Sequence, residues 1–241
     1  MLGTLAILLV LWTIPSEKVV RETFGAGGRN RTYYLFVPDK ATADAPAPLL
    51  LLLHGSGRDG RSLLDPWLSF AKENGIILVA PESNNRQGWS MGEDGPDFLY
   101  ALIEMIRVQQ PVDPRRLYVF GHSAGAMHGL AMAVIESEYF AAVAVHAGTL
   151  PDQVIPLIEH AQRKTPIAIW VGTNDPLFPV HAVRATQTTL NRQGFAAAVT
   201  EIPEHTHNYY NRAPDINRQA WQFLQKHRLD EEPKYRRYET R

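Results

Sequence analysis

The sequence predicts a single α/β domain with a mostly parallel central sheet and helices on both faces. Short apolar runs that read as buried strands alternate along the chain with longer stretches of helical periodicity. The 241 residues are 45% hydrophobic and 20% charged, which is ordinary for a folded domain. No stretch rich in Pro, Gly or Ser divides the chain, so we expect one domain over 19–229, followed by a polar tail over 230–241.

The expected strands begin with an antiparallel strand and continue as buried parallel ones. Residues 31–37 (RTYYLFV) follow the Gly-rich turn 25–28 and are rich in aromatic and β-branched side chains, which favours an early antiparallel strand. Most of the later runs are continuously apolar, as is typical of strands buried on both faces. We place these strands at 49–53, 76–80, 116–120, 141–145, 167–171 and 197–202.

The expected helices lie between these strands, where apolar residues recur with helical spacing. We place them at 63–73, 98–108, 124–135, 154–162, 180–192 and 216–226. Asp97 is expected to cap the helix 98–108, since Asp is a favoured N-cap residue. The tail after Leu229 is dense in charge and is expected to be frayed.

The charge balance and the cysteine count exclude several classes of protein. Lys and Arg number 24 against 25 Asp and Glu, so no global positive field attracts a nucleic acid. The absence of cysteine excludes disulfides, thiolate metal sites and a cysteine nucleophile. The motifs of zinc peptidases, P-loop proteins and dinucleotide-binding domains are also absent. We therefore expect neither a cofactor nor a metal.

The first 15 residues form an apolar segment that we exclude from the fold. The run 2–14 is shorter than the roughly 20 residues that span a bilayer, and its length suits the hydrophobic region of a signal peptide. No Lys or Arg precedes it and no A-x-A site follows it. The segment favours a secreted or periplasmic protein. The alternatives are a buried first strand of a cytoplasmic protein and a misplaced start codon.

The residues 121–125 (GHSAG) fit the pattern G-x-S-x-G, in which a serine occupies a strained turn between a strand and a helix. Here a buried strand precedes the motif and a helix of small residues follows it, which is the expected context. Ser123 is therefore the candidate nucleophile. The alternative is a structural turn with a solvated serine.

A serine nucleophile needs a base and a carboxylate that orients the base, and both occur downstream. Asp175 directly follows the strand 167–171, at the edge where α/β sheets carry their sites. A plain turn aspartate is the alternative interpretation. His205 and His207 both follow the strand 197–202, and either could reach Ser123.

Hydrolysis of an acyl bond also needs donors for the oxyanion. The backbone N–H of Ala124 is one candidate, because it directly follows the nucleophile. The second is the N–H of Gly55 or Ser56, in the H-G-S-G loop after the strand 49–53, although this loop could be only a tight turn.

Several side chains are candidate walls of the substrate pocket. His122 lies beside the nucleophile, while Trp89, Met91 and Phe178 lie on loops next to the elements that carry the site. Packing in the core is an equally good interpretation of the three apolar side chains.

These motifs resemble the serine α/β-hydrolases, in particular the branch that contains polyhydroxybutyrate depolymerases and feruloyl esterases. The similarity runs from about 31 to 229 and is carried by 33–38, by the L-L-H-G run 52–55, by 113–125 (DPRRLYVFGHSAG) and by 172–180 (GTNDPLFPV). The last segment resembles G-x-x-D-x-x-V-P, which implies that Asp175 is the acid. The resemblance implies an α/β-hydrolase fold and hydrolysis of esters.

The histidine region departs from this pattern. Feruloyl esterases show G-H-T-W, which would align His205 with the base, but here Glu204 replaces the glycine and His207 replaces the tryptophan. The run 207–210 (HNYY) is instead similar to the H-S-Y-Y run of S-formylglutathione hydrolases, whose catalytic histidine precedes the aromatic pair. This similarity favours His207.

The resemblance implies aryl, short acyl or polyhydroxyalkanoate-type esters, either small or polymeric, as substrates. A peptidase or thioesterase on the same fold is the first alternative, because a triad does not choose the leaving group. A catalytically silent binding module is the second, because a fold does not imply a function.

Overall fold

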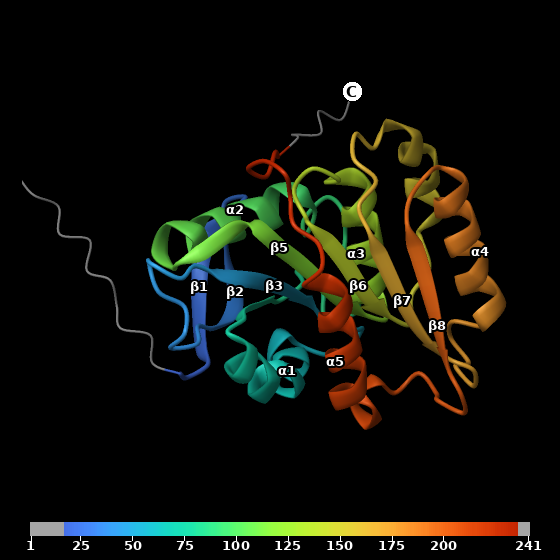
Figure 1. The fold of residues 1–241 in the computed structure, drawn as a ribbon, viewed down its shortest axis with the longest axis horizontal. Helices are drawn as coiled ribbons and strands as arrows, with labels where there is room; N and C mark the ends of the chain where they lie inside the picture. Colours follow the sequence, from blue (N-terminus) through green and yellow to red (C-terminus); the bar gives the residue numbers. More distant parts are fainter. Residues whose placement is uncertain (1–16, 236–241) are drawn as a thin grey trace, which may run out of the picture.

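A computed structural model describes residues 17–235, so the apolar segment 1–15 lies outside the described residues. The centre of the molecule is an eight-stranded sheet in the order β1-β2-β4-β3-β5-β6-β7-β8 (Figure 1). β1 and β2 are antiparallel to each other, β2 is antiparallel to β4, and the remaining pairs are parallel. The strands are β1 (Val20–Ala26), β2 (Arg29–Phe36), β3 (Ala47–Leu53), β4 (Ile77–Pro81), β5 (Val112–His122), β6 (Ala142–His146), β7 (Ile167–Gly172) and β8 (Ala197–Ile202).

Helices cover both faces of the sheet, as the sequence predicts. α1 (Gly60–Asn74) and α5 (Ala213–Leu224) pack on one face. The other face carries α2 (Pro96–Gln109), α3 (Ala124–Ile135), the 3-10 helix η1 (Asp152–His160) and α4 (Val180–Arg192). Successive leucines of β3 point to alternate faces, so that Leu49, Leu51 and Leu53 enter one core while Leu50 and Leu52 enter the other.

Besides shifts of element boundaries and the short 3-10 helix η2 (Tyr209–Asn211), which was not predicted, the structure differs from the predicted elements in three ways. β1 was not predicted, because its sequence VRETFGA is largely polar and four of its seven residues are exposed in a row at the edge of the sheet. η1 is a 3-10 helix and not an α-helix, and it holds Pro156, which cannot donate a helical hydrogen bond. Asp97 does not cap α2. Gly95 is the N-cap, Pro96 follows it, and Asp97 lies within the first turn.

The described part of the polar tail is packed against the domain, and the expectation that it is frayed is wrong for residues 230–235. The ring of Tyr235 stacks on that of Tyr100, with centroids 4.0 Å apart. Glu232 pairs with Arg107 of α2 at 3.0 Å. The tail therefore finds an aromatic and a charged partner on the same helix, which a count of its charges does not reveal.

The described range 17–235 contains no helix that is both long and apolar enough to cross a membrane.

Several histidines are buried near the carboxyl ends of the strands, which is unusual for a side chain that titrates near neutral pH. Burial lowers the pKa of His128, on α3, to about 4, although its Nε2 contacts the backbone carbonyl of Asp94 at 2.9 Å.

This burial predicts that the folded state weakens as the pH falls. The folded-state pKa of His128 lies below the ordinary value of 6.5, so the unfolded chain takes up the proton first and stability is lost between pH 6.5 and 4. We expect His128 alone to account for about 2 kcal/mol of the difference in unfolding free energy between pH 7 and pH 5. Urea unfolding of wild type and His128→Asn at both pH values measures this difference, and the exposed His181 supplies the control variant His181→Asn. An unchanged difference in His128→Asn would contradict the assignment.

Candidate active site

Ser123 lies in a strained turn between β5 and α3. It is the N-cap of α3 and has φ 57° and ψ −118°, a combination that L-residues rarely adopt. The turn is possible because the residues two positions before and two positions after Ser123 are glycines. A Cβ on Gly121 would lie 2.2 Å from the carbonyl oxygen of Gly125, and a Cβ on Gly125 would lie 1.9 Å from that of Leu53. The turn holds Ser123 above the carboxyl edge of the sheet.

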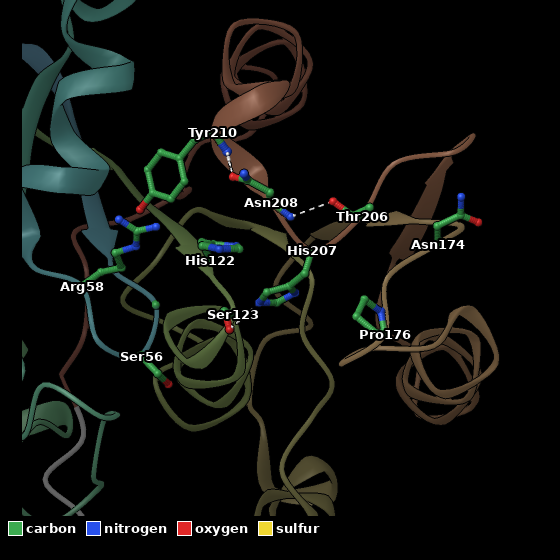
Figure 2. Close-up of a pocket in the computed structure, with 11 residues that line it drawn as sticks. Ser56, Arg58, His122, Ser123, Asn174, Pro176, Thr206, His207, Asn208 and Tyr210 are labelled. Atoms are coloured by element: carbon green, nitrogen blue, oxygen red, sulfur yellow. Dashed lines mark hydrogen bonds between the residues drawn. The ribbon is translucent and has the colours of Figure 1, made fainter.

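Two hydrogen bonds connect Ser123, His207 and Asp175. Nε2 of His207 lies 2.9 Å from Oγ of Ser123, and Nδ1 lies 2.9 Å from Oδ2 of Asp175. Because a carboxylate only accepts, Nδ1 of the neutral imidazole carries the proton, and Nε2 accepts from the serine hydroxyl. The side chain of Asp175 is fully buried, whereas that of His207 is 21% exposed. The carboxylate is thus shielded from water, while the imidazole of His207 lies beside Ser123 in the wall of a cavity (Figure 2).

The turn that carries Asp175 also holds the ring of His207. Oδ1 of Asp175 accepts the backbone N–H groups of Leu177 and Phe178 at 2.8 and 2.9 Å, which leaves Oδ2 for the histidine. The ring of Phe178 stacks on that of His207 with an interplanar angle of 19°. Phe178 therefore packs against the histidine and is absent from the walls of the two cavities described below, contrary to its predicted place in the pocket.

The loop that carries His207 is tied to the loop that carries Asp175. The backbone N–H of Asn174 donates to the carbonyl of His205 at 2.9 Å. A Cβ on Gly172 would lie 2.0 Å from that same oxygen, so only glycine permits the approach. His205, the alternative base, points elsewhere. Its Nε2 lies 3.1 Å from Nε2 of His146, and it makes no hydrogen bond to Ser123.

The predicted oxyanion donors lie around Ser123. The α-carbon of Gly55 faces it closely, since a Cβ there would lie 3.3 Å from Cβ of Ser123. Within the described chain, the N–H groups of Gly55, Ser56 and Ala124 donate to no other residue. They are thus available for a ligand. His54 stabilises this loop, because its Nδ1 lies 2.9 Å from the carbonyl of Gly55 and its Nε2 accepts the N–H of Ser83 at 3.2 Å.

Ser123 lines one cavity, and the next residue, Ala124, lines another. The first has a volume of about 510 Å³ and contains Ser123 and His207 in its wall, with polar neighbours (Figure 2). The second has a volume of about 600 Å³ and has Ala124 in its wall. His122 lines the first cavity, as expected of a pocket residue, and Trp89 and Met91 line the second. The further apolar walls of the second cavity include Met127, Ala131, Leu150 and Val154.

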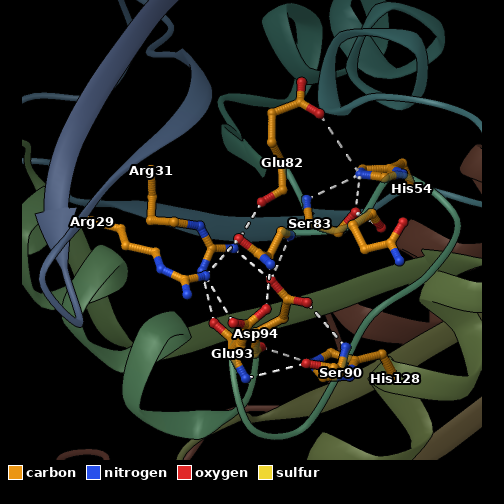
Figure 3. A network of polar contacts seen from close by, with 11 residues as sticks. Arg29, Arg31, His54, Glu82, Ser83, Ser90, Glu93, Asp94 and His128 are labelled. Carbon is orange, nitrogen blue, oxygen red and sulfur yellow. Dashed lines mark hydrogen bonds and ion pairs between the residues drawn. The ribbon is translucent and has the colours of Figure 1, made fainter.

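A buried carboxylate holds the loop that brings Trp89 to the second cavity. Asp94 is 1% exposed, pairs with Arg31 at 2.5 Å and accepts the backbone N–H groups of Asn84 and Ser90 (Figure 3). Nε1 of Trp89 in turn donates to the carbonyl of His54 at 2.8 Å. The ion pair thus joins β2 to the loop between β4 and α2, and the hydrogen bond of Trp89 joins this loop to the predicted oxyanion segment.

Sequence reasoning missed several residues of this region. Asp94 lies in a polar loop without a motif, and its partner Arg31 is far away in the chain. Arg58 and Tyr210 line the first cavity, with the guanidinium 4.9 Å from the centroid of the ring. Two signals were available: Arg58 follows the predicted oxyanion loop, and Tyr210 belongs to the run 207–210 that begins with His207. Residues 17–235 contain no group of three or more His, Asp or Glu side chains that could hold a metal ion.

Comparisons with known proteins relate this chain to an esterase and to a depolymerase by name. The chain is 31% identical over 128 residues to the protein named "Probable feruloyl esterase C" of Aspergillus flavus. The aligned residues cover 49% of this chain and 47% of that protein. It is 25% identical over 156 residues to "Poly(3-hydroxyalkanoate) depolymerase C" of Paucimonas lemoignei, which covers 58% and 37%. The chain thus spans about half the length, or less, of these relatives. Both names belong to the branch that the sequence motifs resemble.

Solved structures agree on the fold. FphF, a fluorophosphonate-binding serine hydrolase of Staphylococcus aureus, superposes with a TM-score of 0.75 at 14% identity, over 86% of this chain and 98% of that one. At this identity the likeness concerns the fold alone, and it confirms the predicted α/β-hydrolase fold. The sequence model of the dienelactone hydrolase family matches residues 86–228, which is more than half of the chain. This chain is therefore a member of the dienelactone hydrolase family.

Proposed function

We propose that the chain is a carboxylic ester hydrolase that works through an acyl-enzyme on Ser123, with His207 as base and Asp175 as the residue that orients it. The observation that carries the proposal is the pair of 2.9 Å hydrogen bonds that join these three side chains. Membership of the dienelactone hydrolase family and the names of the relatives support the same reaction.

In the first half of the reaction, Oγ of Ser123 attacks the ester carbonyl while Nε2 of His207 takes its proton. The negative charge that develops on the carbonyl oxygen is stabilised by the free N–H of Ala124 together with that of Gly55 or Ser56. The imidazolium then gives its proton to the leaving alcohol. Asp175 stabilises the imidazolium through Nδ1 and keeps the ring in the productive tautomer.

In the second half, water enters on the side that the alcohol has left. Its oxygen bonds to the acyl carbon while one of its protons passes to Nε2 of His207. The tetrahedral intermediate collapses, the bond between the acyl carbon and Oγ breaks, and Ser123 recovers that proton. The carboxylic acid product leaves, and no cofactor enters the balance.

The second cavity supports an apolar acyl group as its occupant. Its walls include the predicted oxyanion donor Ala124 together with Trp89, Met91 and Met127. Aryl and feruloyl groups, short acyl chains and polyhydroxyalkanoate units all have this character. Amide and thioester substrates remain the alternatives on the same machinery, and a silent binding module is the alternative without chemistry.

The triad predicts which variants lose activity. We expect Ser123→Ala and His207→Ala each to lower kcat on p-nitrophenyl acetate by at least about 10³-fold, because the nucleophile and its base act as one unit. His205→Ala is the matched control, since that imidazole faces His146, and its kcat should fall by less than about tenfold. Steady-state kinetics on the purified variants measure these changes.

Covalent labelling tests the proposal without a substrate. A fluorophosphonate probe should add once to the wild type, at Ser123, and not to Ser123→Ala, as read by intact-mass spectrometry. If the folded wild type stays unlabelled, the triad is wrong and the binding module is the better interpretation. Turnover of matched ester, thioester and amide substrates then separates the esterase from its enzymatic alternatives.

Filling the second cavity tests the acyl subsite. Met127→Trp adds bulk to its wall without touching the triad. We expect kcat/KM to fall about tenfold or more for methyl ferulate and to stay within about twofold for p-nitrophenyl acetate, since only the larger acyl group needs the space. Equal losses on both esters would place the acyl group elsewhere.

A further inference from the structure

Three buried histidines form a chain that leads away from the candidate active site. Nδ1 of His122, at the end of β5, lies 3.1 Å from Nδ1 of His146, at the end of β6. Nε2 of His146 lies 3.1 Å from Nε2 of His205, in the loop after β8. His146 is fully buried, and the other two are 5% and 7% exposed. The mechanism above uses none of them.

The position of one carbonyl group determines which ring nitrogens of these histidines carry a proton. Each nitrogen-to-nitrogen contact needs one N–H and one lone pair. Nδ1 of His122 also faces the carbonyl oxygen of His146 at 3.4 Å, and an oxygen of this kind only accepts, so the proton belongs on Nδ1 of His122. His146 must then accept at Nδ1 and donate from Nε2 to His205.

This assignment of protons requires that all three imidazole rings are neutral. Burial keeps them neutral because it disfavours the charged form. Burial lowers the pKa of His122 to about 3 and that of His146 to about 2, and it also lowers the pKa of His205. A neutral His122 with its proton on Nδ1 carries a bare lone pair on Nε2. The ring beside Ser123 is therefore a hydrogen-bond acceptor and not a competing base.

Nε2 of His122 has no hydrogen-bond partner among residues 17–235. Some side-chain atoms of this range lack a partner because they are sealed from solvent, but Nε2 of His122 is not one of them. It is therefore accessible to solvent, and the ring that carries it lines the first cavity together with Ser123 and His207. The rings of His122 and His207 lie side by side in this wall, with centroids 5.0 Å apart (Figure 2).

We propose that Nε2 of His122 is a catalytic acceptor that holds the hydrolytic water during deacylation, and that His146 is the positioning residue that keeps this nitrogen unprotonated. The inference rests on the proposed acyl-enzyme at Ser123. The water donates one proton to Nε2 of His207 as its oxygen bonds to the acyl carbon, and its second O–H stays hydrogen-bonded to His122. That second proton leaves with the carboxylic acid product.

A role for His122 in binding the leaving alcohol is the competing interpretation, and kinetics separate the two. p-Nitrophenyl acetate and phenyl acetate form the same acetyl-enzyme, so a group that acts on water affects one shared deacylation constant. A group that binds the alcohol affects acylation, and does so differently for the two esters.

The test is rapid-quench mass spectrometry of His122→Phe with both esters, which gives the acylation and deacylation constants separately. Phe keeps the ring and removes the acceptor. We expect deacylation to slow about tenfold and equally for both esters, while acylation changes less than about twofold. Unchanged deacylation, or a loss that depends on the alcohol, overturns the proposal. A wild type that forms no acetyl-enzyme at Ser123 overturns the proposed function as well, so the two failures are distinct.

His146 supplies the second arm of the test. His146→Leu should also slow deacylation, and His146→Gln should restore it, because its amide can accept from His122 and donate to His205. Nitrogen-15 NMR of the histidines in the wild type should show the proton of His122 on Nδ1. A proton on Nε2, or a failure of Gln to differ from Leu, counts against the positioning role. The exposed His181→Gln on α4 is the control and should leave both constants unchanged.

Discussion

The site depends on one close contact between backbones, that of Gly125 with the end of β3. A single Cβ at Gly125 would lie 1.9 Å from the carbonyl oxygen of Leu53, a distance that no side chain tolerates. Because α3 begins so near β3, the nucleophile turn and the Gly55 loop become neighbours. The strained backbone of Ser123 costs about 1–3 kcal/mol, which the buried cores on both faces of the sheet offset.

A second constraint is electrostatic. Asp94 is buried and would destabilise the fold if it were unpaired, but Arg31 and two backbone N–H groups satisfy it. The loop between β4 and α2 is thereby held to β2, and Trp89 is held between the rings of His54 and His128. The apolar wall of the second cavity thus derives its position from a charge that does not line it.

The sequence was sufficient wherever a pattern is local. The Leu run of β3, the glycines around Ser123 and the aspartate after β7 each combine a residue type with its neighbours in the chain, and the predicted boundaries of α3, α4 and β8 agree with the structure. The contacts that cross the fold were out of reach. The Arg31–Asp94 pair spans 63 positions, and the link from His146 to His205 spans 59. The sequence predicted correctly that Phe178 lies near the site. It could not predict that the ring packs on His207 and does not line the pocket.

The four residues 175–178 combine two duties in one turn. Asp175 presents one carboxylate oxygen to His207 and uses the other to close the turn, and Phe178 at its far end covers the same imidazole. Asp175 and Phe178 therefore form one module. The number of residues between them matters more than the length of the loops that connect the module to the rest of the chain. An insertion within this module would separate carboxylate from ring, whereas a lengthened connection between α4 and β8 would leave the module intact. In this protein, loops outside the turn 175–178 can change in length, whereas the turn itself tolerates almost no change.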